Sequence, residues 1–113
     1  MAKFQLSAIQ HPENPDLYRI EALKDFGDVL IGDLGGYVDS EDRLDQSGDC
    51  WIDEDAIVCD SAFVTGFATI EGEAIICGDS FISGDAIVGG KAVFLSGGID
   101  QYETAPETTT HYI

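Results

Sequence analysis

Basic residues are scarce in this chain. Its 113 residues include 5 Lys and Arg against 22 Asp and Glu, so the formal net charge is −17. Nucleic acids and anionic membranes are polyanions, and so large a negative charge argues against direct binding to either. The charge favours solubility and attraction to a basic protein surface. Many soluble proteins are acidic without a specific basic partner, so the charge alone leaves both interpretations open.

Histidines, cysteines and phosphate-binding motifs are also sparse. His11 and His111 are the two histidines, and both lie outside the regular repeat described below. The three cysteines are odd in number and include no CxxC pair, which argues against a disulfide framework and a zinc site. No GxxxxGKS or GxxxxGKT motif is present. We therefore expect no cofactor, no metal and no catalytic residues.

Long apolar runs are missing as well. No stretch approaches the ~20 residues that a membrane-spanning helix needs. Met1 is followed by a polar, proline-containing segment rather than by an apolar signal sequence. We expect a cytoplasmic protein, in the cytoplasm of the host cell if the chain is encoded by a phage.

A six-residue period runs without a slip from Gly48 to Leu95. In each of its eight units the third place is small and the fifth is large and apolar, and the first place is Gly in six units. A fixed short period is typical of a solenoid. Successive side chains of a strand face opposite ways, so places three and five should point inward and places four and six outward. Places one and two form the corner, where Gly tolerates a positive φ.

The predicted fold is all-β, a parallel β-helix of about three to four coils with an N-terminal capping β-hairpin. Residues 1–31 form the hairpin cap, residues 32–95 the solenoid and residues 96–113 a C-terminal tail. The first coil is irregular, because Asp42 falls in a small place and Gln46 begins a two-residue break in the register. An inward-pointing Asp42 would need a partner, or the coil is distorted there.

The repeat resembles the hexapeptide-repeat family, whose motif is an aliphatic residue followed four places later by a small one. Val58 with Ala62 and Ile70 with Ala74 carry this motif. The resemblance implies a left-handed β-helix with three sides and eighteen residues in each coil. Enzymes of the family include acyltransferases and zinc carbonic anhydrases, which depend on histidines on the solenoid. Because the repeat has no histidine, we expect a protein that is not an enzyme.

A second resemblance concerns origin. Gly35-Gly-Tyr-Val and Gly48-Asp-Cys-Trp stand before tandem GDA-like units. This outline resembles short solenoid proteins of phage and prophage genomes. It implies a phage origin and no particular activity.

When the outward-facing residues are grouped with those eighteen positions away, which lie on the same side of the next coil, two of the three sides are apolar. Solvent-facing ladders of large apolar residues mark a buried contact, so we expect a homodimer through the side that carries Ile57, Ile75 and Val93. The cap or the tail could instead cover one of the two sides. The predicted self-association residues are Ile57, Cys59, Ile75, Cys77, Val93, Leu95, Phe63 and Phe81.

The remaining side and the corners are acidic. Carboxylates one rung apart repel each other, so these columns do not serve stability. The predicted partner-binding residues are Asp39, Glu41, Asp42, Asp45, Asp49, Asp53, Glu54, Asp55, Glu71, Glu73 and Asp85. We expect a DNA mimic, an inhibitor of the anti-CRISPR or anti-restriction type that blocks the basic nucleic-acid-binding surface of a host defence complex. The alternative is an assembly solenoid that only homo-oligomerises.

Overall fold

The computed structural model describes residues 2–53, 55–95, 98–99, 104–105 and 110–111. Its only helical element within these ranges is the 3-10 helix η1 (Glu41–Arg43), and the other elements are strands. No helix in these ranges is long and apolar enough to cross a membrane. The strands are β1 (Phe4–His11), β2 (Asn14–Ala22), β3 (Leu34–Val38), β4 (Trp51–Ile52), β5 (Ile57–Val58), β6 (Phe63–Val64), β7 (Thr69–Ile70), β8 (Ile75–Ile76), β9 (Phe81–Ile82), β10 (Ile87–Val88), β11 (Val93–Phe94), β12 (Gly98–Ile99), β13 (Thr104–Ala105) and β14 (Thr110–His111).

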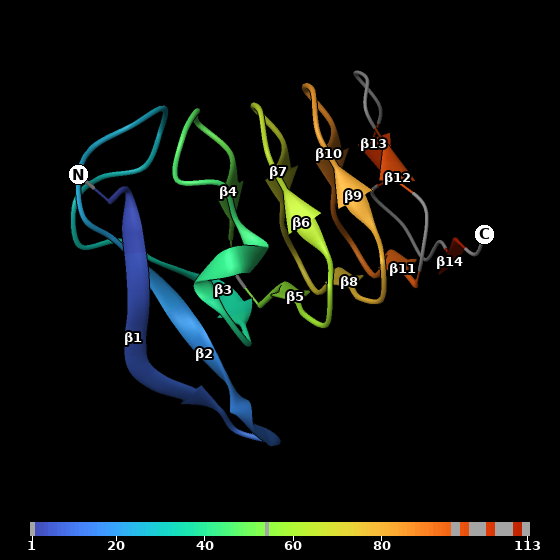
Figure 1. Cartoon of the computed structure of the whole chain (residues 1–113), viewed down its shortest axis with the longest axis horizontal. Helices are drawn as coiled ribbons and strands as arrows, with labels where there is room; N and C mark the ends of the chain where they lie inside the picture. The colour runs from blue at the N-terminus through green and yellow to red at the C-terminus, as the bar shows by residue number, and fades with distance from the viewer. Residues whose placement is uncertain (1, 54, 96–97, 100–103, 106–109, 112–113) are drawn as a thin grey trace.

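The two-residue strands stack in parallel to form the three sides of a β-solenoid. One side runs β3-β5-β8-β11-β14, the second β4-β7-β10-β13 and the third β6-β9-β12. Ile57 pairs with Ile75 and Val58 with Ile76, so each coil takes eighteen residues. Figure 1 shows the rungs following one another from the hairpin toward the C-terminal strands. The predicted parallel β-solenoid is confirmed, and its left hand stays a prediction.

The inward places build the core. Ala56, Val58, Ala62 and Val64 are fully buried, and their neighbours in place four are half-buried. Small and large residues alternate along each rung, which suits close packing in a narrow interior. At the corner, Gly66 has φ +73 and lies so close to the next coil that an added Cβ would be 3.0 Å from the Gly84 nitrogen. The period of small, large and Gly residues therefore reflects the geometry of one rung.

The N-terminal cap closes one end of this core. β1 and β2 form an antiparallel hairpin, β2 pairs antiparallel with β3, and β3 pairs in parallel with β5. The hairpin thus continues one side of the solenoid, and it extends beyond the rungs in Figure 1. Phe4, Ile20 and Ala22 lie buried over the first coil. The predicted capping hairpin is confirmed.

Of the two alternatives for Asp42, the structure shows the distorted coil, because Ser40 caps η1 and leaves Asp42 exposed. Two other details differ from the prediction. Trp51 occupies an outward place but is only 5% exposed, since the N-terminal segment covers it. Finally, β12, β13 and β14 pair in parallel with β9, β10 and β11, within the segment predicted as a tail. Rung pairing uses backbone hydrogen bonds, which do not require the side-chain period.

Candidate functional site

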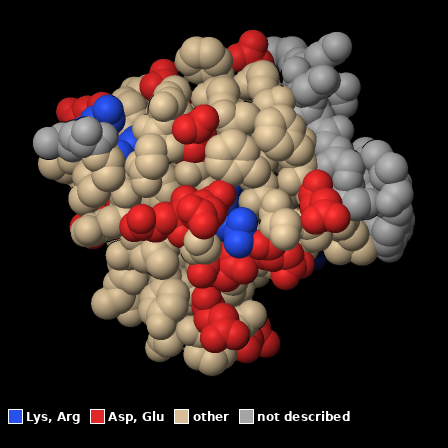
Figure 2. Space-filling model, in the orientation of Figure 1, with Lys and Arg blue, Asp and Glu red and all other residues tan. Residues whose placement is uncertain are grey.

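Carboxylates gather in a band across one face of the molecule, around a basic side chain (Figure 2). Two ion pairs neutralise a small part of this charge. Arg43 Nε lies 2.8 Å from Asp39 Oδ1, and Arg19 Nη2 lies 2.8 Å from Asp55 Oδ1. Both pairs are near the surface, so they contribute little to stability. The predicted clustering of acidic residues near Asp39 and Asp55 is therefore present, and most of its charge faces solvent.

One hollow on the described surface, which we call the acidic groove, has a volume of about 530 Å³. It lies between the N-terminal segment and the side formed by β4 and β7. Five carboxylates, four apolar side chains and one hydroxyl line it, together with a glycine. These residues are Gly27, Asp28, Val29, Asp33, Leu34, Asp49, Trp51, Asp53, Phe67, Thr69 and Glu71.

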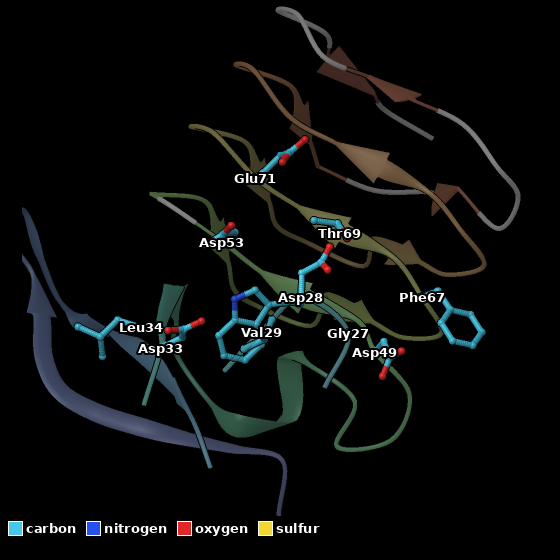
Figure 3. A pocket seen from close by; sticks show the side chains of 11 residues that line it. Gly27, Asp28, Val29, Asp33, Leu34, Asp49, Asp53, Phe67, Thr69 and Glu71 are labelled. Atoms are coloured by element: carbon cyan, nitrogen blue, oxygen red, sulfur yellow. The ribbon is translucent and has the colours of Figure 1, made fainter. Parts of the chain in front are cut away.

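The solenoid supplies one wall of the acidic groove. Trp51 pairs with Thr69 on neighbouring rungs, so Asp53 and Glu71 follow one above the other (Figure 3). Asp49 and Phe67 lie together at the opposite corner of the groove in the same view. The sequence correctly predicted that Asp53 stacks on Glu71.

The N-terminal segment supplies the other wall. Phe26 and Val29 pair with each other in a tight turn, which carries Asp28 into the groove. The Phe26 ring packs edge-on against Trp51, with ring centroids 5.3 Å apart. This contact fixes the turn over the floor of the groove. Sequence reasoning missed Asp28, because it treated residues 1–31 only as a cover for the core, and it assigned no role to Asp33 at the start of the solenoid. The acidity of both residues in a turn-rich segment was the available signal.

A second hollow, the His11 groove, has a volume of about 440 Å³. It is lined by His11, Pro12, Glu13, Tyr37, Asp55, Ile57, Glu73 and Ile75. The His11 ring packs edge-on against Tyr37 at 4.6 Å, and its Nδ1 accepts a hydrogen bond of 3.0 Å from the Glu13 N–H. In the neutral ring the proton therefore lies on Nε2. The tip of the hairpin thus brings a histidine to the solenoid side, although this residue lies outside the repeat.

The other predicted acidic residues are dispersed. Glu41 is exposed on η1, and Asp85 lies at a corner away from both grooves. Asp45 Oδ2 accepts a 2.6 Å hydrogen bond from the Thr65 hydroxyl, which with the Ser47 N–H lowers the pKa of Asp45 below its ordinary value. Glu54 lies outside the described residues.

The predicted self-association residues remain on the surface. Phe81 is 48% exposed and Leu95 40% exposed. Phe63 and Phe81 are stacked on neighbouring rungs, with ring centroids 6.0 Å apart. The hairpin tip approaches Ile57 and Ile75 at the His11 groove and leaves them half-buried. Homodimerisation through this side stays a prediction.

Cys59 and Cys77 lie on neighbouring rungs, as predicted. Their sulfur atoms are 2.8 Å apart and share a hydrogen bond. That bond lowers the pKa of Cys77 and raises the pKa of Cys59, so one thiol ionises well before the other. Asp60 follows at the corner with φ +64, as the only described non-glycine residue with a positive φ. This conformation costs about 1 kcal/mol in a residue with a side chain.

Two comparisons with known proteins bear on function. No protein-family profile matches the chain. A curated Escherichia coli (strain K12) protein, named uncharacterized acetyltransferase YdcK, is 38% identical over 76 residues. The match covers 58% of this chain and 23% of that relative, so the chain spans less than a quarter of the relative's length.

This relative overturns the prediction that the protein is not an enzyme. The prediction was wrong because it rested on the histidines that the repeat lacks. A histidine on the coil is one way to accept a proton during acyl transfer, and carboxylates can also act as bases. The absence of one catalytic residue type in the repeat therefore did not exclude catalysis.

Proposed function

We propose that the protein takes part in acetyl transfer to an amine, and that the acidic groove binds the cationic acceptor. The observation that carries this proposal is the presence of five carboxylates, together with Trp51 and Phe67, around one hollow of about 530 Å³. An ammonium ion is attracted by these charges and packs favourably near aromatic rings. The similarity to a protein named an acetyltransferase supports the choice of reaction.

Acetyl transfer to an ammonium ion requires a proton transfer and then a nucleophilic attack. The bound ammonium must lose a proton, which a groove carboxylate such as Asp53 or Glu71 can accept directly or through water. The neutral nitrogen then attacks the carbonyl carbon of an acetyl thioester. The C–N bond forms, the C–S bond breaks, and the leaving sulfur takes up a proton to give a thiol.

The chain offers little to a phosphate-bearing acetyl donor. Lys3 is buried, and Arg19 and Arg43 are paired with aspartates. Lys24 and Lys91 are then the only remaining basic side chains, because no Lys or Arg lies outside the described ranges. Lys24 lies in the N-terminal cap and Lys91 in the last regular unit of the repeat, so they provide no cluster of cations for the phosphates of a donor. Our proposal assigns the acceptor side of the reaction to this chain.

The test combines binding and product analysis. Titration calorimetry with a polyamine, an amino sugar and a lysine peptide should find an acceptor whose affinity falls about tenfold in the Asp53→Asn, Glu71→Gln double variant. The N-acetylated acceptor should form with a phosphate-free acetyl thioester as donor and be detectable by mass spectrometry. His11→Gln, in the other groove, is the matched control and should bind the acceptor normally. Equal binding by all three proteins would refute the groove assignment, and binding without acetylation would refute the reaction.

The acidic columns favour a second candidate. We propose that they also suit a basic, nucleic-acid-binding surface of a host defence complex, consistent with the phage-like outline of the sequence. The supporting observation is the band of carboxylates in Figure 2, in which two ion pairs involve Asp39 and Asp55. Capture of such a complex should weaken as salt is raised, and replacing Asp49, Asp53 and Asp55 by Lys should abolish it. Binding that ignores both changes would exclude this role.

A further inference from the structure

Two thiols and a carboxylate converge at one corner of the solenoid, away from both grooves. The Sγ atoms of Cys59 and Cys77 and a carboxylate oxygen of Asp60 all lie within 4.8 Å of one another. The two cysteines are half-buried and Asp60 is exposed, so the cluster is reachable from solvent. The cysteines are eighteen residues apart, a spacing that no short zinc motif has. Stacking of successive coils is what brings them together.

Asp60 occupies the first place of its unit, a corner position that is Gly in six of the eight units. The Gly residues in the corresponding corner place have φ values from +59 to +73, and Asp60 adopts φ +64 with a side chain. One Asp60 oxygen, Oδ2, accepts a 3.0 Å hydrogen bond from the Gly78 N–H. Within the described chain, the other oxygen makes no hydrogen bond. Strain of this kind is kept where a side chain is needed at that point.

The residues around the Cys59, Cys77 and Asp60 cluster add negative charge. Asp39 Oδ2 accepts the Asp60 N–H at 3.1 Å, which places a second carboxylate beside the cluster. Arg43 is paired with that same Asp39. Ionised thiols at this corner would therefore be repelled by two neighbouring carboxylates unless a cation lay between them.

We propose that Cys59, Cys77 and Asp60 form a binding site for a thiophilic divalent cation, with zinc as the best-matched ion. Zinc takes sulfur ligands at about 2.3 Å and carboxylate oxygens at about 2.0–2.2 Å in tetrahedral geometry. Rotation of the cysteine side chains opens the present sulfur contact enough to admit the ion. Binding releases the two thiol protons to solvent and forms two Zn–S bonds and one Zn–O bond. Three protein ligands leave the fourth position for water.

Cobalt and zinc titrations of the reduced, full-length protein test this site. One Co²⁺ per chain should give the intense near-ultraviolet absorption of thiolate-to-cobalt charge transfer, and Zn²⁺ should displace it. Cys59→Ser should remove this absorption. Asp60→Asn keeps the shape and tolerance of a positive φ, and it should weaken zinc binding at least about tenfold.

Asp79→Asn is the matched control, because it removes one carboxylate from the neighbouring corner outside the cluster. It should bind zinc like the unaltered protein, and thermal unfolding should verify that each variant is folded. Charge-transfer absorption that survives Cys59→Ser would overturn the site. So would equal zinc affinities of Asp60→Asn and Asp79→Asn, or a Cys59–Cys77 disulfide together with no zinc uptake after reduction.

Discussion

Replacing Lys3 with methionine should lower the free energy of unfolding by about 3 kcal/mol. Lys3 is 1% exposed, and its Nζ donates hydrogen bonds to Cys50 O at 2.8 Å and to Gly48 O at 3.3 Å. Its Nζ also lies 4.9 Å from the centroid of the Phe26 ring. Methionine keeps most of the packing but removes the donors. The Cys50 carbonyl group would then be buried without this donor.

The substitution also has a stabilising effect, because methionine removes the cost of burying the charged lysine. Replacing a buried ion pair by apolar residues is often neutral, because both charged partners are removed together. Here the partners are backbone carbonyls, which no substitution of Lys3 removes. The cost of losing their donor therefore outweighs the relief of desolvation.

Urea unfolding measures this effect as a lower midpoint at an unchanged slope. Lys24→Met is the matched control, because Lys24 is exposed on the same N-terminal segment. Its substitution should change stability by less than about 0.5 kcal/mol. A loss for Lys3→Met no larger than that of Lys24→Met would show that the buried network contributes nothing.

The features that the sequence predicted correctly are those that depend on the six-residue period. Ala62 and Val64 point inward because every rung has the same cross-section, and the pairing of Cys59 with Cys77 follows from a coil of eighteen residues. The acidic stack of Asp53 and Glu71 follows from the same count. These features repeat, so a single sequence contains several copies of the evidence for each.

Contacts between the cap and the solenoid could not be predicted in the same way. Lys3 reaches Cys50, 47 residues along the chain, and nothing in either neighbourhood marks the pairing. Trp51 fits the outward pattern of the repeat and is buried only because Phe26 packs against it. Asp28 enters the acidic groove through that same docking. Half of the candidate site thus depends on one non-repeating interface.

A substitution in the interface between the cap and the solenoid should also have a large effect on stability. Gly36→Ala should lower the free energy of unfolding by about 3 kcal/mol. Gly36 is buried in β3, the strand that joins the hairpin to the first coil. A Cβ at this position would lie 2.4 Å from the Ala56 carbonyl oxygen and 2.6 Å from Ile52 Cγ2. Neither the backbone oxygen nor the packed isoleucine can move aside without separating β3 from the solenoid.

Gly89→Ala is the matched control for this substitution. Neither glycine has a positive φ, so alanine is compatible with the backbone at both positions. The Cβ at Gly89 would meet Glu71 Cγ at 3.0 Å, which is part of a flexible side chain that can shift. Alanine also restricts the unfolded chain, so Gly89→Ala should stabilise the protein by up to about 1 kcal/mol. Thermal and urea unfolding of the two variants should move in opposite directions, and equal shifts would contradict the close approach of β3 to the first coil.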